Sequence, residues 1–451
     1  MQNERSNFTG KIGFVLAAAG SAVGLGNIWR FPYLAARYGG GIFLLVYLAL
    51  VLTIGFVLMT TEIAIGRKTG LSAIGAFQKL NRKYTFIGTL GAIVPMIILP
   101  YYSVIGGWVT KYLVEFVSGG ALETAGDGFF GSFISSTSEP LVWFCVYLGM
   151  TALVVFFGVE KGIEKVSKIL MPILVVLAVA IAGYVVTRPG ALEGVLYYFT
   201  PDFSRFSATT VLAALGQMFY SMSIAMGIMI TYGSYMKKDV NLISSAKQIA
   251  LFDTGIAFVA GLMIVPAVFV FSGGSETALG KGPGLMFETL PKVFESMNFG
   301  GVVGAAFFLL VLFAALTSSI SLMETVVSVV QDQWKLKRIH ACFVVLGLSI
   351  LLGVPSSLGF GVWSEFTIFG FSFLDFFDFI SNSVLMPIGA FLTCLFVGFV
   401  IKPKTVLDEI EVSAPFKGKR WYRMVVCYFA PICILLVLIS SILDAFGILK
   451  I

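Results

Sequence analysis

The chain is dominated by long apolar stretches that short polar connections separate. A helix needs about 20 apolar residues to cross the hydrocarbon layer of a membrane, and eleven stretches meet this requirement. They cover about residues 11–37, 41–66, 86–117, 141–158, 165–187, 208–233, 241–272, 300–333, 339–357, 373–400 and 422–446. The pattern predicts an all-α polytopic membrane protein whose eleven transmembrane helices are numbered below in this order.

The composition agrees with this pattern and excludes a soluble enzyme. Of 451 residues, 58% are hydrophobic and 12% are charged, whereas a soluble protein usually carries about 25% charged residues. The single histidine, His340, cannot build a multi-histidine zinc site, and it makes a Ser-His-Asp triad implausible. The net charge of +6 comes from basic residues scattered between apolar stretches, so the expected partner is the lipid bilayer and not nucleic acid.

Basic residues also indicate how the chain lies in the membrane. Most of the 30 Lys and Arg residues fall in connections on one side of the predicted spans, which identifies that side as cytoplasmic. This places the N-terminus in the cytoplasm, and eleven spans then place the C-terminus outside. No connection is rich enough in Pro, Gly or Ser to divide the chain, so we predict one transmembrane domain over residues 1–451. The pattern does not indicate an oligomeric state.

Two spans carry polar interruptions at mid-membrane. The first has three glycines and Asn27 within residues 20–27, and the sixth has the sequence GQMFYSMS at 216–223. Gly20 and Gly24 have the spacing of a helix-packing pair. Three glycines beside an Asn favour an unwound backbone, whose free carbonyls suit a cation and whose free amides suit a carboxylate. The step of five spans predicts inverted repeats over about 11–187 and 208–400, followed by one extra span at 422–446.

Two other spans place polar groups at depth. In the eighth span Ala314, Thr317 and Ser318 share one helix face. Such hydroxyls often bond back to their own helix, and they can also line a site. In the seventh span Asp253 lies six residues beyond Lys247, about 9 Å deeper into the membrane by helical rise. A buried carboxylate is costly unless it is paired or binds a cation, so Asp253 is predicted to be functional.

Four motifs carry a resemblance to a known family. They are GSAVGLGNIWRFP at 20–32, EIAIGR at 62–67, TYGSY at 231–235 and LTSS at 316–319. Over about residues 5–400 the chain resembles the sodium:neurotransmitter symporter family, and within it the bacterial hydrophobic amino acid transporters. The resemblance implies sodium-coupled symport by alternating access, in a bacterial inner membrane. The chain has eleven predicted spans, whereas the leucine transporter has twelve. Some other bacterial members of the family also have eleven.

The resemblance implies two sodium ions as coupling ions. The first would contact the Ala22 carbonyl, Asn27, Ser221 and Asp253, and the second would contact the carbonyls of Gly20, Val23 and Ala314 with the hydroxyls of Thr317 and Ser318. It also implies a substrate pocket, with Tyr220 as its lid and with the substrate carboxylate near the backbone at Gly24 and Gly26. The implied lining is Ala22, Gly24, Gly26, Ile98, Tyr102, Tyr220, Ser221, Ser223, Met226, Ser318 and Leu322.

The resemblance further implies a gate on each side of the pocket. The outer gate would pair Arg30 with Asp378, beside Gln217; Asp375, one turn away, is the alternative partner. The inner gate would pair Arg5 with Asp332, supported by Phe8 and Tyr235. Either pair could also be an ordinary ion pair at a helix end.

The implied pocket indicates the class of substrate. Amine-transporting relatives have an Asp where this chain has Gly24, so Gly24 leaves room for a substrate carboxylate. The apolar lining at Ile98, Met226 and Leu322 then predicts neutral hydrophobic L-amino acids, aromatic ones included. Chloride-dependent relatives have a neutral Asn at the position of Asp253 and a Ser at that of Ala257. The fixed charge of Asp253 therefore predicts transport without chloride.

Two other classes of function fit the sequence less well. A channel or an amino-acid-sensing receptor on the same fold is the main alternative. A channel needs a continuous polar file, whereas the polar residues here gather near mid-membrane. An intramembrane enzyme would need catalytic groups at depth, and the two carboxylates available, Glu62 and Asp253, lie on different spans.

Overall fold

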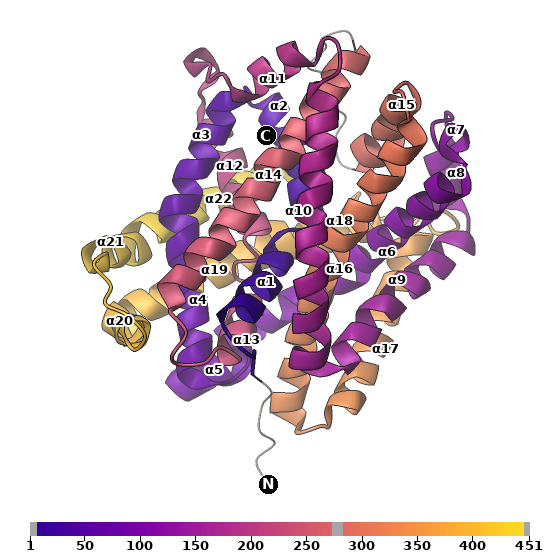
Figure 1. Ribbon diagram of the computed structural model, residues 1–451. Coiled ribbons are helices and arrows are strands. Elements are labelled where there is room, and N and C mark those ends of the chain that lie inside the picture. The colour runs from indigo at the N-terminus through magenta and orange to yellow at the C-terminus, as the bar shows by residue number, and fades with distance from the viewer. Residues whose placement is uncertain (1–6, 273–282, 446–451) are drawn as a thin grey trace.

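The computed structural model describes residues 7–272 and 283–445 and consists almost entirely of helices (Figure 1). In this part of the chain the only β-bridges are isolated ones, such as Gly40 with Pro201. Nine helical stretches are long and apolar enough to span a membrane, and a tenth is a helix pair bent by 56°. The predicted all-α polytopic membrane protein is therefore confirmed.

The first five spans follow the predicted order. Span one is α1 (Lys11–Ala22), a π-helical turn η1 (Gly26–Arg30) and α2 (Phe31–Arg37). Span two combines α3 (Gly41–Leu50), η2 (Val51–Gly55) and α4 (Phe56–Thr69). Span three is η3 (Arg82–Tyr84) with α6 (Thr85–Ser118), span four is α9 (Glu139–Phe156), and span five is η4 (Val159–Glu164) with α10 (Lys165–Val186).

The remaining spans include the second broken helix. Span six divides into α12 (Ala208–Ser221) and α13 (Ile228–Ser234), each too short to cross a membrane alone. Spans seven to nine are α14 (Leu242–Ser272), α16 (Gly300–Trp334) and α17 (Arg338–Leu358). Span ten is α18 (Phe373–Asp378), η8 (Phe379–Leu385), α19 (Met386–Leu395) and η9 (Phe396–Val400), and span eleven is α21 (Lys419–Met424), η10 (Val425–Phe429) and α22 (Ala430–Ala445).

Short helices occupy the connections. They are α5 (Ala73–Leu80), α7 (Ala121–Thr124), α8 (Phe129–Ser135), α11 (Ala191–Phe199), η5 (Phe203–Arg205), η7 (Leu285–Thr289), α15 (Leu290–Glu295) and α20 (Lys402–Glu411). Several carry an apolar side that packs on the bundle, as Val406, Leu407 and Ile410 do in α20. The sequence pattern did not predict these helices, because each is shorter than a membrane-spanning segment.

The two broken spans lie at the centre of the bundle and run antiparallel. α1 packs against α13, and η1 and α2 pack against α12, so the first half of each span meets the second half of the other. α1 also packs on α10, α14 and α16, and α6 lies along α16 (Figure 1). This arrangement brings the two breaks side by side, as expected for inverted repeats.

Candidate functional site

The first helix break exposes backbone groups to the interior of the bundle. α1 ends at Ala22, and Val23 is extended, with a ψ of 102°. The freed amides find side-chain partners: Gly24 N donates to Asn27 Oδ1 at 3.0 Å and Leu25 N donates to the Tyr102 hydroxyl at 3.2 Å. These partners satisfy amides that a membrane interior would otherwise leave unbonded. The predicted break in the first span is present.

The second break lies further along the chain than the polar stretch suggested. The helix continues through Gly216 to Ser221, so the break predicted within 216–223 begins only at residue 222. Residues 222–227 then unwind, with positive φ angles at Ser223 (52°), Ala225 (62°) and Gly227 (68°). The amide of Ala225 donates to Glu62 Oε1 at 2.7 Å. A carboxylate from span two therefore stabilises this backbone, which a local sequence pattern could not reveal.

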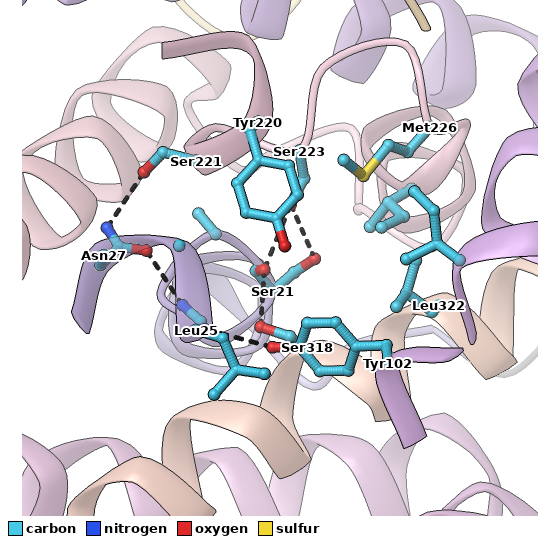
Figure 2. A pocket seen from close by; sticks show the side chains of 15 residues that line it. Ser21, Leu25, Asn27, Tyr102, Tyr220, Ser221, Ser223, Met226, Ser318 and Leu322 are labelled. Carbon is cyan, nitrogen blue, oxygen red and sulfur yellow. Dashed lines mark hydrogen bonds between the residues drawn. The ribbon is translucent and has the colours of Figure 1, made fainter. Parts of the chain in front are cut away.

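A first cluster of polar side chains joins the two breaks to span seven. Asp253 is fully buried, and its Oδ1 accepts hydrogen bonds from Ser221 Oγ at 2.6 Å and from Asn27 Nδ2 at 2.7 Å. Asn27 Nδ2 also donates to Ser221 Oγ at 3.0 Å (Figure 2). The structure thus brings together the three side chains predicted for the first sodium. Asn27 presents its NH₂ group to the cluster, so its amide must turn before it can offer oxygen to a cation.

A second cluster gathers backbone oxygens around one hydroxyl of span eight. Ser318 Oγ lies 3.3 Å from the Gly20 carbonyl oxygen, 3.1 Å from that of Ser21 and 3.2 Å from that of Val23. A hydroxyl has a single hydrogen to donate, so this group of acceptors is larger than Ser318 can satisfy. Hard oxygen ligands in excess of the available donors are what an alkali or alkaline-earth cation requires.

Thr317 borders this cluster. Its hydroxyl lies 3.0 Å from the Phe313 carbonyl oxygen and 3.1 Å from that of Ala314, so it bonds back to its own helix. A Cβ added at Gly20 would come within 3.0 Å of Thr317 Cβ, which shows how closely α1 and α16 approach here. All five residues predicted for the second sodium therefore lie at one crossing of α1 and α16.

A small cavity lies between the two clusters (Figure 2). Its volume is about 30 Å³, room for about two water molecules. All eleven predicted substrate contacts line it, together with Ser21, Leu25, Asn27 and Ile228. No charged side chain is among the lining residues. Met226 and Leu322 are the flexible side chains of the lining, so a larger ligand could enter when they move.

Two glycines of the first break are necessary for this geometry. A Cβ added at Gly24 would lie 2.6 Å from Ser318 Oγ and 2.9 Å from the Tyr102 hydroxyl, and one at Gly26 would lie 2.4 Å from the Tyr220 ring. Side chains at these positions would therefore fill the space beside the freed amides. The glycines keep polar backbone groups accessible from the cavity.

The predicted outer gate is only partly assembled. The Arg30 guanidinium lies over the Tyr220 ring, 5.4 Å from its centroid. Asp378 accepts hydrogen bonds from the Tyr101 hydroxyl at 3.1 Å and from Asn382 Nδ2 at 2.7 Å. Among the ion pairs within 4.0 Å in the described chain, none joins Arg30 to Asp378.

Asp375 and Gln217, the other two residues predicted at the outer gate, bond to different partners. Asp375 bonds with Ser372 at the start of its own helix, its amide donating to Ser372 Oγ at 3.1 Å. Asp378 is therefore the carboxylate that faces the bundle. Gln217 Nε2 donates to the Gly26 carbonyl at 3.0 Å, so Gln217 holds the first break in place.

The predicted inner gate involves Arg5, which lies outside the described residues. Its expected partner Asp332 accepts hydrogen bonds from the Ser72 amide at 2.8 Å and from the Ser72 hydroxyl at 2.5 Å. Phe8 is buried, and its amide donates to the Tyr235 carbonyl at 3.1 Å. The Tyr235 hydroxyl donates to Glu324 Oε1 at 2.7 Å. Phe8 and Tyr235 thus form a contact across this end of the bundle.

Comparison with known proteins identifies the family. The sodium:neurotransmitter symporter family matches residues 5–121 and 132–448, nearly the whole chain. The chain belongs to this family. This membership explains the four motifs, which lie on the broken spans one and six and on spans two and eight, which pack against them.

Individual proteins are similar to this chain over most of its length. A solved structure, MhsT in complex with L-phenylalanine, is 40% identical in sequence, covers 97% of this chain and all of its own, and has a TM-score of 0.88. An uncharacterized sodium-dependent transporter of Bacillus subtilis, YhdH, is 37% identical over 96% of each chain. The sodium- and chloride-dependent GABA transporter 2 of Homo sapiens is 25% identical over 90% of this chain and 75% of its own.

Sequence analysis did not assign roles to Glu62 and Ser21. Glu62 holds the break of span six, and Ser21 contributes a carbonyl to the second cluster and a hydroxyl 3.4 Å from that of Ser223. A carboxylate inside span two was a signal that could have been followed, since such groups are rarely found in membranes without a function. Ser21 carried no comparable signal, because its contribution comes from the backbone.

Proposed function

We propose that this symporter couples the uptake of neutral hydrophobic L-amino acids, aromatic ones included, to sodium by alternating access. The cavity supports this proposal. Its lining carries no charge to pair with a charged side chain, and Ile98, Met226 and Leu322 offer an apolar surface. The 40% identical MhsT has been solved with L-phenylalanine, which is a substrate of the proposed class.

The single observation that carries the proposal is the space beside Gly24. A side chain there would collide with Ser318 and Tyr102, so Gly24 leaves room for a ligand beside the backbone where η1 begins at Gly26. The N-terminal end of a helical segment favours a carboxylate. An amino acid supplies that carboxylate, whereas a biogenic amine would need an acidic residue at this position.

The proposal assigns one sodium ion to each cluster. The first would bind the Ala22 carbonyl, Asn27, Ser221, Asp253 and the carboxylate of the substrate. The second would bind the carbonyls of Gly20, Val23 and Ala314 with Thr317 and Ser318. Support comes from two groups of contacts that flank one cavity. Asn27 and Ser221 bond to Asp253 in the first cluster, and Ser318 lies beside the carbonyls of Gly20 and Val23 in the second. The ion and the substrate would then stabilise each other, which is the basis of coupling.

Chloride is not required in this proposal. Asp253 supplies a fixed negative charge to the first cluster, and the Tyr47 hydroxyl lies 3.4 Å from its Oδ2. Ala257 is buried one turn further along α14 and offers no hydroxyl. A fixed carboxylate can balance the charge of two sodium ions and a zwitterion, so a mobile anion has no necessary role.

Alternating access would use the two inverted repeats, with Arg30 and Asp378 closing the outer side and Arg5 and Asp332 the inner side. The distribution of basic residues supports a cytoplasmic N-terminus and an extracellular C-terminus. The similar transporter YhdH is bacterial, which supports a place in the bacterial inner membrane. Closure of the outer gate would require Arg30 to move from its position over Tyr220 toward Asp378.

Competition binding tests the class of substrate. Purified protein in saturating sodium would bind labelled L-phenylalanine, and unlabelled leucine, methionine, tyrosine or tryptophan should displace it. Glutamate, lysine, GABA and dopamine should not compete at equal concentration. Stronger displacement by a charged amino acid or by an amine would contradict the proposed pocket.

A further inference from the structure

A groove that the transport site does not use lies where spans ten and eleven end. It has a volume of about 530 Å³ and is lined by Lys402, Pro403, Lys404, Arg423, Met424, Cys427 and Tyr428. The lining comes from the start of α20 and from α21 with η10, which lie together at one side of the bundle, at the left in Figure 1. η9 and η10 pack closely beside it, because a Cβ at Gly398 would lie 3.3 Å from Cys427 Sγ.

The groove concentrates positive charge that the protein does not neutralise. Lys402, Lys404 and Arg423 are all exposed. In the described chain none of the three takes part in an ion pair within 4.0 Å. The lining of the groove therefore has three positive charges and no acidic residue.

None of the three acidic residues of α20 forms an ion pair with the cations of the groove. Glu409 is buried and pairs with Arg67 at 2.8 Å and with Lys238 at 2.6 Å. Glu411 pairs with Lys419 at 2.7 Å. Asp408, the third carboxylate of α20, is exposed, lies outside the lining of the groove and takes part in no ion pair within 4.0 Å in the described chain. No carboxylate of α20 therefore pairs with Lys402, Lys404 or Arg423, which leaves their charge for an external partner.

An apolar stripe continues from the groove along span eleven. Tyr428 is 63% exposed, Ile432 60%, Leu435 44% and Leu436 51%. These positions follow one another at helical spacing, so they form one outward face of the helix. The stripe begins at Tyr428, which is itself part of the groove. A ligand that is anionic at one end and apolar along its length would match both features.

The position of the groove fits the boundary between membrane and water. Trp421 is 43% exposed and lies about two turns before the stripe, and exposed tryptophans are typical of that boundary. Basic pockets between helices at this level recognise lipid phosphates. We propose that the groove of Lys402, Lys404 and Arg423 binds the headgroup of an anionic phospholipid, whose acyl chain lies along Tyr428, Ile432 and Leu436.

The experiment compares lipid binding by the full-length protein and two variants with equal loss of charge. The groove variant carries Lys402→Gln, Lys404→Gln and Arg423→Gln. The control variant carries Lys417→Gln, Lys419→Gln and Arg420→Gln, in the same connection but outside the groove. Native mass spectrometry in detergent would measure the retention of added phosphatidylglycerol and phosphatidylcholine by each protein.

The parent and the control variant should retain phosphatidylglycerol and release phosphatidylcholine. Each basic residue near a membrane surface contributes about fivefold to the affinity for an anionic lipid, so the groove variant should bind phosphatidylglycerol at least about tenfold more weakly. Inorganic phosphate at millimolar concentration should not displace the lipid, because it cannot occupy the apolar stripe.

Three results would overturn the proposal. They are equal retention of phosphatidylglycerol by the two variants, equal retention of both lipids by the parent, and displacement of the lipid by free phosphate. Sodium-dependent substrate binding by the groove variant serves as the control for folding. If the triple variant fails that control, Arg423→Gln alone should still lower retention relative to Arg420→Gln, and equal retention by these single variants would also refute the site.

Discussion

Replacing Asp253 by Asn tests how charge is balanced at the first cluster. The side chain is fully buried, and its Oδ1 lies within 2.7 Å of both Ser221 Oγ and Asn27 Nδ2. The substitution keeps the size and one oxygen of the side chain, and it removes the negative charge. The variant therefore separates the charge from the packing.

The expected effect follows from the Coulomb energy. A carboxylate and a cation about 4 Å apart interact by about 4 kcal/mol at an effective dielectric constant of about 20. The Asn oxygen can still serve as a ligand, so we expect about half of this energy to be lost. About 2 kcal/mol corresponds to a roughly 30-fold weaker affinity for sodium.

The assay is sodium-dependent uptake of labelled L-phenylalanine into proteoliposomes, in gluconate and in chloride. The parent should transport equally in both. Asp253→Asn should need roughly 30-fold more sodium in gluconate, and chloride should recover part of the loss because it supplies the missing charge. Asp239→Asn, the same change on an exposed loop, is the matched control.

Either of two results would refute this reasoning. One is a strong requirement for chloride in the parent, which would mean that the fixed charge does not replace an anion. The other is an unchanged sodium dependence of Asp253→Asn in gluconate, which would mean that Asp253 does not act on the bound cation.

Three further substitutions test the second cluster, the pocket and the second break. Thr317→Val removes a hydroxyl and keeps the shape of the side chain, so the affinity for sodium should fall at least about tenfold while the fold survives, as measured by sodium titration of substrate binding. Gly24→Ala places a Cβ 2.6 Å from Ser318 Oγ, and this overpacking of about 1–3 kcal/mol should weaken the binding of L-phenylalanine at least about fivefold. Glu62→Ala leaves the buried Ala225 amide without its acceptor, which should lower the free energy of unfolding by about 1–3 kcal/mol and lower the thermal midpoint.

Each of these substitutions has a control on the same or a neighbouring helix. Thr325→Val changes a buried hydroxyl two turns along α16, and Gly216→Ala adds a methyl group with no atom within 4 Å. Glu62→Gln keeps an acceptor for the amide. If Thr317→Val and Thr325→Val shift the sodium titration equally, the second cluster is not the ion site. If Gly24→Ala and Gly216→Ala bind L-phenylalanine with equal affinity, the predicted position of the substrate carboxylate is wrong. If Glu62→Ala and Glu62→Gln have the same free energy of unfolding, the hydrogen bond to the Ala225 amide contributes little.

The membrane architecture could be predicted from the sequence because hydrophobicity along a spanning helix is a local property. The first break could also be predicted, since its glycines and Asn27 are adjacent in the chain. The second break was displaced from its predicted place. The carboxylate that stabilises it belongs to Glu62 in span two, 163 residues away from Ala225, and the polar residues at 216–221 remain helical.

The residues around the cavity illustrate what a motif can and cannot predict. All eleven predicted contacts line the cavity, because a family resemblance carries long-range geometry that periodicity does not. Pairing at the gates was harder to predict. Asp378 already bonds with Tyr101 and Asn382. Whether Arg30 pairs with this carboxylate therefore depends on the conformation of the transporter and on competition with these two neighbours. A local sequence pattern encodes neither of them.

The most direct test of the proposed function is accumulation of labelled L-phenylalanine by proteoliposomes under an inward sodium gradient. The account predicts accumulation above the external concentration, its collapse when a sodium ionophore removes the gradient, and exchange of internal label for external unlabelled substrate. Equilibration without accumulation would identify a channel, and sodium-dependent binding without uptake would identify a receptor. Either result would contradict sodium-coupled symport.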